Sequence, residues 1–406
     1  MPFEAIGAAI ARAGRAPTIG RMVAVDGPQI QSFRLERHHL NRRLPAGGLV
    51  DATAACGIQE TPKLTAALAL HARVDDVTVA DVGRALKRDK TLLTVWAMRG
   101  APYVVPTGEA AIFTAGALPV GDDSWRRFFG GWATSLSERD TSLSALVQQA
   151  SEAAFEVLDG RELAVEDLRQ EIAKRMPEIR GLSRPSGAHA DLPEPLFRAI
   201  GPRGVVCIAD TRRMTDAILA RTDQWLGEPP PPPNQDGASA ELLRRYLRCY
   251  GPSTQKAFAE WTLRSAADVR TTFEAIMSEL VEIRVERTVE LLLAADLDDL
   301  TSPAEPTGVR LLPAHDPFLQ QRDRHRLLPD SELRKRLWRP VGSPGLVLID
   351  GQAKAIWSSH REGNTLRITV DPFGKLRKSE RHAISDEANS IAPLRGAVQS
   401  ALTVNE

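Results

Sequence analysis

The side chains that most often carry redox or metal chemistry are sparse in this sequence. Its three cysteines, Cys56, Cys207 and Cys249, stand far apart, and none belongs to a CxxC pair. Three cysteines are too few for a disulfide framework, and their spacing is wrong for a zinc finger. The eight histidines include no HExxH or similar spacing. We therefore predict no metal site, and we expect each cysteine to be a small buried residue in a reducing compartment.

Common catalytic fingerprints are absent as well. The chain has no GxxxxGK[ST] phosphate loop, no GxGxxG fingerprint and no GxSxG elbow, which leaves hydrolase, dehydrogenase and nucleotide-driven functions with little support from motifs. No apolar run approaches the roughly 20 residues of a membrane span. The N-terminal segment carries early charges and no cleavage-like end, so we expect no signal peptide and a cytoplasmic protein.

Charge is balanced over the whole chain but not along it. The 406 residues contain 52 Lys and Arg against 52 Asp and Glu, whereas residues 310–381 contain 15 against 8. The stretch FRLERHHLNRR near the N-terminus is also basic. Such stretches would let one face of the protein hold a polyanion, although solvated surface charge is the simpler reading of charge alone.

The secondary-structure elements that must position these residues are predicted to repeat in the same order three times between Arg34 and Leu297. Helical patterns precede the β-like runs TLLTVWAM and APYVV in the first copy, and VEIRVE and TVELLLA in the third. The second copy has the run GVVCIAD, followed by TDAILARTDQWL, which we read as helical. Thr78, Ser253 and Ser265 are expected to cap helices. Helices followed by a hairpin predict a winged helix, so this order predicts three in tandem.

After Thr301 the pattern changes to short apolar runs between polar turns, interrupted by one helical segment, SELRKRLWR. We predict an α+β protein in which three tandem winged-helix domains precede a small C-terminal β-barrel or curled sheet. The expected domains are an N-terminal extension (1–33) and two winged helices (34–132 and 133–228). A Pro-rich linker (229–237) then leads to the third winged helix (238–300), and the barrel-like domain (301–406) follows.

Four ordered stretches resemble the AlkZ-like winged-helix DNA glycosylases. The run VWAMRGAPYVVP is similar to that family's TWxMRGTLHLVP, and LRCYGPSTQKAFAEWT to its YGPxTxxDFxxW. The run LLPAHDPFLQQRDR resembles LLPxFDxYLLGxRDR, and IDGQAKAIW resembles VDGxxxGxW. The resemblance implies a monomer that binds double-stranded DNA, with alkylated DNA expected, and that uses no cofactor. It also implies excision of alkylated purines, including bulky or cross-linked adducts, with a possible role in resistance to a self-made genotoxin.

The family's catalytic motif, a Gln, an apolar residue and then Gln or Asp, aligns with GIQETP. Gln59 matches the first catalytic position, whereas Thr61 stands at the second and Glu60 at the apolar one. In an extended segment Gln59 and Thr61 point to one side and Glu60 to the other. Gln59 would then position water or stabilise the sugar cation with help from Thr61, while Glu60 would be a solvated charge. A role for Gln59 as a polar residue near the helix that follows is the competing interpretation.

Basic residues are the candidates for contacts with DNA phosphates. Arg99 is expected to be exposed at a hairpin turn, with a structural ion pair as the alternative. Alternating Arg and Asp from Asp316 to Arg324 also predict an internal ion-pair network. The full set of DNA-binding candidates is Arg37, His38, Arg42, Arg43, Arg99, Arg322, Arg324, His325, Arg326, Lys375, Arg377 and Lys378.

Thr61 leaves enzymatic activity open. One alternative is a non-catalytic family member that binds damaged DNA or a promoter, and the departure from the catalytic motif favours it. Another is an interaction scaffold that has lost DNA binding too, which the neutral overall charge favours and the basic C-terminal stretch opposes.

Overall fold

The computed structural model describes residues 22–137, 142–179, 192–210, 217–228 and 234–405. Most of the predicted Pro-rich linker, residues 229–233, lies outside the described residues. The described strands form four small sheets, each associated with helices, so the predicted α+β class is confirmed. No helix in the described part is long and apolar enough to cross a membrane.

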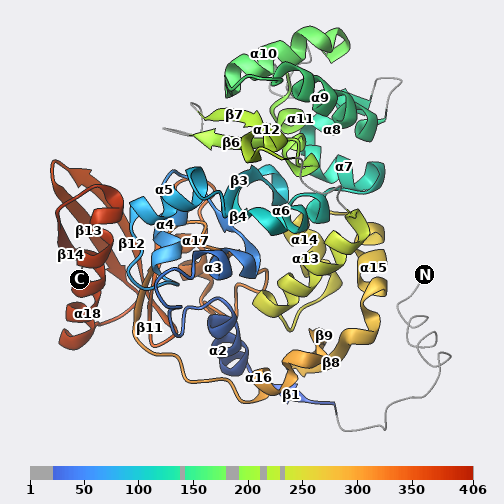
Figure 1. Cartoon of the computed structure of the whole chain (residues 1–406). Helices are drawn as coiled ribbons and strands as arrows, with labels where there is room; N and C mark the ends of the chain where they lie inside the picture. Colours follow the sequence, from blue (N-terminus) through green and yellow to red (C-terminus); the bar gives the residue numbers. More distant parts are fainter. Residues whose placement is uncertain (1–21, 138–141, 180–191, 211–216, 229–233, 406) are drawn as a thin grey trace.

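The first region lies at the centre of the molecule (Figure 1) and has a three-stranded sheet of order β2-β4-β3. Thr78 caps α5 as predicted, in a capping box with Asp81. The elements are α3 (Leu49–Cys56), β2 (Ile58–Gln59), α4 (Thr65–His71), α5 (Val79–Lys87), β3 (Leu92–Trp96), β4 (Pro102–Pro106) and α6 (Ala110–Phe113). Helices α7 (Gly121–Phe129) and α8 (Ala133–Ser137) come next in the chain, and their buried residues join the core of the second region.

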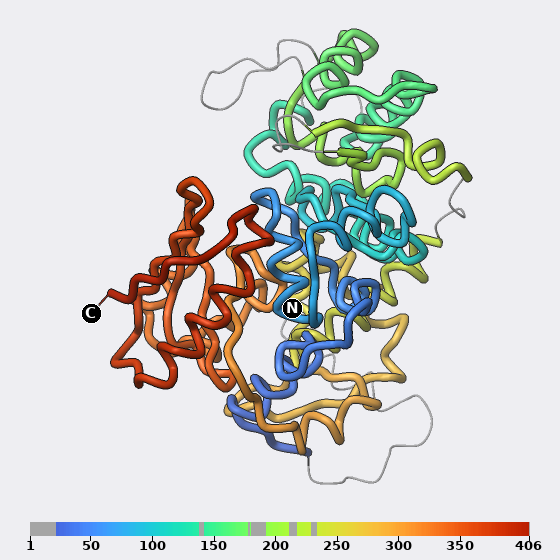
Figure 2. The backbone as a smooth tube through the Cα atoms, turned by 60° about the vertical axis from the view of Figure 1, so that its left-hand side comes forward, coloured from blue at the N-terminus to red at the C-terminus, as the bar shows by residue number. Residues whose placement is uncertain are grey.

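The second region forms the end of the molecule farthest from the N-terminal helix α2 (Figures 1 and 2). Its elements are α9 (Leu143–Val157), β5 (Leu163–Ala164), α10 (Val165–Arg175), α11 (Glu194–Ala199), β6 (Val206–Asp210), β7 (Ile218–Arg221) and α12 (Thr222–Leu226). The helix predicted over TDAILARTDQWL is therefore wrong over residues 218–221, which form β7, and right over 222–226, which form α12. Residues 218–221 pair with both β6 and β5, and this tertiary pairing outweighs local propensity in so short a run.

The third region combines N-terminal and central residues. Its elements are β1 (Ala24–Val25), α2 (Gly27–Arg37), α13 (Gln235–Tyr250), α14 (Gln255–Thr262), α15 (Ala266–Ala275), β8 (Leu280–Val285), β9 (Thr288–Leu293) and α16 (Leu297–Thr301). Strand β1 pairs with β8 in parallel, so the boundary predicted at residue 34 falls inside α2. Ser265 caps α15 as predicted, but Thr254 rather than Ser253 caps α14.

The C-terminal region contains an open five-stranded sheet of order β10-β11-β12-β13-β14, so the described strands form no closed barrel and the predicted β-barrel is not confirmed. The chain returns through α18 before β14, which pairs with β13 in parallel and leaves β10 and β14 at opposite edges. The elements are β10 (Val309–Leu312), η10 (Pro317–Gln320), α17 (Ser331–Leu337), β11 (Gly345–Ile349), β12 (Gln352–Glu362), β13 (Thr365–Pro372), α18 (Lys378–Ile391) and β14 (Gln399–Val404).

Helix α18 was not predicted from the sequence. Its apolar residues Ile384, Ala388 and Ile391 recur at helical spacing and are buried against the sheet with Leu366 and Ile368. Burial of this stripe explains why a segment with many polar residues is helical.

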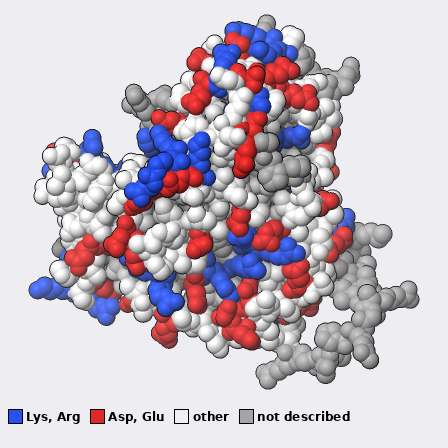
Figure 3. All heavy atoms as spheres, in the orientation of Figure 1, with Lys and Arg blue, Asp and Glu red and all other residues white. Residues whose placement is uncertain are grey.

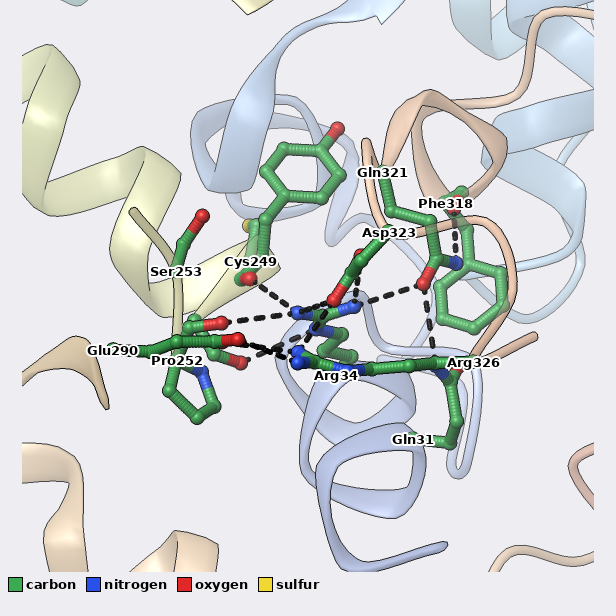
Figure 4. Close-up of polar contacts among 12 residues, drawn as sticks. Gln31, Arg34, Cys249, Pro252, Ser253, Glu290, Phe318, Gln321, Asp323 and Arg326 are labelled. Atoms are coloured by element: carbon green, nitrogen blue, oxygen red, sulfur yellow. Dashed lines mark hydrogen bonds and ion pairs between the residues drawn. The ribbon is translucent and has the colours of Figure 1, made fainter. Parts of the chain in front are cut away.

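Two buried arginines join the C-terminal region to the others. Arg34, 1% exposed, donates to the Asp323 carboxylate at 2.8 and 2.9 Å, to Gln321 and to three backbone carbonyls between α13 and α14 (Figure 4). Arg73, which follows α4, makes a bidentate pair with Asp316 at 2.8 and 2.7 Å. Asp316 also accepts the backbone N–H of Phe318 and so caps η10. The predicted ion-pair network is confirmed for Asp316 and Asp323, and it fixes η10 against the first region.

Candidate active site

A cavity of about 300 Å³ lies where the first region meets the segment from η10 to α17. Four residues predicted from the sequence line it together: Gln59, Arg99, Arg322 and Arg324. The remaining lining residues are Ala101, His315, Leu319, Gln320, Leu337, Trp338, Ser343 and Pro344. Residues more than 200 positions apart thus form one site that contains the first residue of the motif.

Gln59 is placed by the short strand β2. This strand pairs with β4, with Gln59 opposite Tyr103, while the preceding Ile58 is buried in the core. Because side chains alternate along a strand, burial of Ile58 turns Gln59 toward the cavity. Its Oε1 accepts a hydrogen bond from Gln320 Nε2 at 3.3 Å.

Thr61 does not line this cavity, which corrects the expectation that it lies beside Gln59. The strand ends at Gln59 and the chain then turns toward α4, so the alternation of a strand does not extend to Thr61. Its hydroxyl is buried and has no hydrogen-bond partner among the described residues. Thr61 is therefore not placed to act on a group bound in the cavity.

Glu60 is half-buried and is not the solvated charge expected from the sequence. Its carboxylate accepts the backbone N–H groups of Leu64 and Ala66 at 2.8 and 2.7 Å, at the start of α4. Burial raises the pKa of Glu60, and the two N–H groups oppose that rise. Its role is to satisfy backbone donors that the first turn of a helix leaves without partners.

Arg99 is held inside the site, which corrects the expectation of an exposed arginine at a hairpin turn. It lies in the short turn η1 (Met98–Gly100) between β3 and β4. Its guanidinium donates to the Trp261 carbonyl at 2.7 Å, to the Tyr103 hydroxyl at 2.7 Å and to Gln320 Oε1 at 2.8 Å. All three acceptors are neutral, so no carboxylate of the described part of the chain pairs with this guanidinium.

The cavity is cationic. Arg322 makes no hydrogen bond or ion pair to any described residue, and burial together with Arg99 and Arg324 lowers its pKa to about 10. Arg324 lies over the Trp338 ring at 4.7 Å, and burial lowers its pKa as well. Burial and, next, the charge of Arg99 lower the pKa of His315, which disfavours a further positive charge in the cavity. Among the residues that the structure describes, no carboxylate lines the cavity to balance three arginines, and a bound anion would do so.

Two further DNA-binding candidates are enclosed by the fold. His38 is fully buried between Tyr250 and Phe318, and its Nε2 lies 3.2 Å from the Cys249 carbonyl. Arg326 pairs with Glu290 and Asp323, and its side chain is 7% exposed. Both predictions of contact with DNA are therefore wrong, because His38 packs in an aromatic core and Arg326 completes the ion-pair network.

The other basic candidates lie away from the cavity. Arg37 pairs with Asp296 and Asp299, and Arg43 pairs with Glu387. Both line a more open hollow of about 1210 Å³, together with the exposed Arg42. The remaining candidates, Lys375, Arg377, Lys378 and His325, are exposed; the first three precede or begin α18 and do not lie in a hairpin. In Figure 3, basic groups on the visible face gather in separate patches, one of them over α5, with acidic groups beside and between the patches.

All three cysteines are buried, as predicted. Cys56 and Cys249, far apart in sequence, meet at His38, and among the described residues this trio is the one group with ligand atoms close enough to hold a metal, within 4.8 Å of one another. These side chains already have partners within the protein. Cys56 Sγ contacts His38 Nδ1, His38 Nε2 contacts the Cys249 carbonyl, and Cys249 Sγ donates to the Ala55 carbonyl. The absence of a metal stays a prediction.

Gln320 is the main site residue that sequence analysis missed. It is 9% exposed and contacts Gln59, Arg99 and Tyr103. The available signal was a pair of glutamines directly after the apolar run of LLPAHDPFLQQRDR.

Comparison with known families identifies the class of protein to which this fold and cavity belong. The family model described as DNA glycosylase AlkZ-like matches residues 52–394, and the chain belongs to this family. The resemblance found in the sequence is thus confirmed, and the family implies DNA as the partner and DNA repair as the process.

Two relatives extend this comparison. The interstrand DNA cross-link repair glycosylase of Streptomyces sahachiroi is 25% identical over 376 residues, which cover 91% of this chain and 96% of the relative. The solved structure of Streptomyces sahachiroi DNA glycosylase AlkZ superposes with a TM-score of 0.73 at 22% identity, covering 94% of this chain and all of that one. The similarity therefore extends over almost the whole fold.

Proposed function

We propose that this protein is a monofunctional DNA glycosylase that hydrolyses the N-glycosidic bond of alkylated purines in double-stranded DNA. Bulky or cross-linked adducts are the favoured substrates, and the protein acts as a monomer without a metal or cofactor. The observation that carries the proposal is the exposure of the Gln59 amide to a cavity with three arginines and no carboxylate. We further propose that the three helix-and-sheet regions before residue 301 are winged-helix units that cradle the duplex.

The chemistry suits a neutral site residue. An alkylated purine such as 7-methylguanine is already cationic, so its departure needs little help from an acid. The sugar develops positive charge as the base leaves, and a water must approach the anomeric carbon. An amide can orient that water and interact with the sugar without being protonated or deprotonated. Arg99, Arg322 and Arg324 would hold the phosphates flanking the lesion, whose charge also favours the sugar cation.

A non-catalytic DNA-binding function is the second candidate, and a specific observation favours it. Thr61 lies outside the cavity, so the second position of the catalytic motif contributes nothing there. A protein of this kind would bind alkylated DNA through the same arginines and leave the glycosidic bond intact.

The test uses a duplex with a single 7-methylguanine and the unmodified duplex as control. We expect the full-length protein to produce alkali-sensitive strand breaks at the lesion alone, with activity that follows the protein through size-exclusion chromatography. Binding without breaks, both on this duplex and on one with a bulky N7 adduct, would overturn catalysis and favour the second candidate.

Arg322→Gln should weaken binding to duplex DNA. Because no carboxylate neutralises Arg322, it is free to pair with a phosphate, and its loss should reduce the slope of log affinity against log salt by about 1. Fluorescence anisotropy between 50 and 300 mM salt measures this slope. Arg175→Gln, which removes an exposed arginine paired with Glu171 on α10, is the matched control and should leave the slope unchanged. Equal slopes for wild type and Arg322→Gln would contradict the phosphate contact.

A further inference from the structure

Gln59 is held by a second glutamine from a distant part of the chain. Gln320 ends η10, and its Nε2 donates to Gln59 Oε1 at 3.3 Å and to the His315 carbonyl at 3.3 Å. Both glutamines line the same cavity. The site therefore contains two carboxamides, although the second of them is not in the sequence motif.

The chemistry of its partners determines which way the Gln320 amide faces. Its Oε1 accepts from Arg99 Nη2 at 2.8 Å and from the Tyr103 hydroxyl at 3.1 Å. A guanidinium can only donate, so the Gln320 oxygen must face Arg99 and its NH₂ group must face Gln59. Two rigid elements, the β3–β4 turn and η10, thus fix one of the two amide orientations.

The same reasoning then fixes Gln59. Since Gln320 presents an N–H group, Gln59 must present its oxygen, and the Gln59 NH₂ group is turned away from Gln320. That NH₂ group makes no hydrogen bond to any described residue. One lone pair of Oε1 also remains, because a carbonyl oxygen has two. These are the atoms available to a water or to the sugar.

We propose that Gln320 is a positioning residue that holds the Gln59 carboxamide in its reactive orientation, and so supplies the second polar position that Thr61 does not. The inference rests on the proposed glycosylase function. It also accounts for the lack of a carboxylate or second motif amide beside Gln59, because the fold brings in an amide from a segment about 260 residues away.

Gln320→Glu is the variant that isolates this role. A carboxylate keeps the length and shape of glutamine and still accepts from Arg99 and Tyr103, so we expect the fold to be retained. It presents an oxygen where Gln59 requires a donor, which repels Gln59 Oε1 and favours the opposite amide orientation. The single-turnover excision rate at saturating protein should fall about tenfold, the loss expected when one hydrogen bond is removed. Because the new carboxylate also pairs with Arg99, DNA affinity should fall as well, and saturating protein keeps that loss out of the measured rate. Gln352→Glu, an exposed change of the same chemistry on β12, is the matched control.

A double-variant comparison separates positioning from a general structural effect. If Gln320 acts through Gln59, adding Gln320→Glu to Gln59→Ala should cause no further loss of rate. A wild-type rate in Gln320→Glu, or a full additional loss in the double variant, would overturn the inference while leaving the glycosylase function in place.

A readout independent of excision covers the case in which the wild-type protein does not cut. The side-chain NH₂ signals of Gln59 can be assigned in a ¹⁵N-labelled sample by their loss in Gln59→Ala. Gln320→Glu should shift these signals, and Gln352→Glu should not. Unshifted signals would overturn the positioning role, whereas shifted signals with no excision would support it and reject the proposed function.

Discussion

Gln59→Ala should lower the single-turnover rate of base excision by about 10²–10³-fold, the range typical for loss of one positioned catalytic or transition-state-stabilising group. Gln59 is the one residue of the predicted catalytic pair that reaches the cavity. Its removal leaves the arginines in place, so DNA affinity should stay within about twofold. The measurement is the burst of alkali-sensitive breaks at 7-methylguanine with protein in excess over DNA.

Thr61→Val is the matched control for this prediction. Valine has nearly the shape of threonine but lacks the hydroxyl, and that hydroxyl is buried, unpartnered and outside the cavity. The excision rate should therefore stay within about threefold of wild type, with stability equal or slightly higher because an unsatisfied buried group is removed. A loss for Thr61→Val as large as that for Gln59→Ala would show that position 61 moves into the site when DNA binds.

Local patterns in the sequence were sufficient to predict most of the helices and strands. The caps Thr78 and Ser265 lie where predicted, and the apolar runs that became β3, β4, β8 and β9 lie within one or two residues of their bounds. These features depend on neighbours a few residues away, and hydrophobic periodicity reports such neighbours directly. The topology of the C-terminal sheet was not predicted correctly. It depends on α18, whose apolar stripe was not recognised in the sequence.

The site was predicted only in part, because it also depends on contacts between residues far apart in the sequence. Gln59, Arg99, Arg322 and Arg324 were chosen from motifs and charge, and the fold brings them together. Whether a basic side chain faces DNA depends on its tertiary partners, which sequence spacing does not reveal. Arg326 is neutralised by Glu290, whereas Arg322, earlier in the same segment, has no such partner among the described residues.

Asp316→Ala should be the most destabilising single change considered for this protein. The Arg73–Asp316 pair is buried at 1% and 0% side-chain exposure, and loss of the carboxylate would leave the Arg73 guanidinium charged in the interior. Removal of one partner of a buried ion pair costs about 3–5 kcal/mol. Thermal and urea unfolding of the full-length protein should register a corresponding loss, and excision should fall too, because Asp316 caps the turn that carries Gln320.

Two comparisons test the cause of that loss. Glu332→Ala breaks an ion pair with Lys335 of similar length, 2.7 Å, but with both side chains more than 70% exposed, and should cost less than about 1 kcal/mol. The double variant Arg73→Met/Asp316→Leu removes both charges, so it should recover most of the stability lost in Asp316→Ala, since no uncompensated charge stays buried. If the double variant were as unstable as Asp316→Ala, the loss would lie in the cap of η10 and in packing, and not in the buried guanidinium. If excision also stayed low in a restored double variant, the Asp316 cap itself would be required to place Gln320 against Gln59.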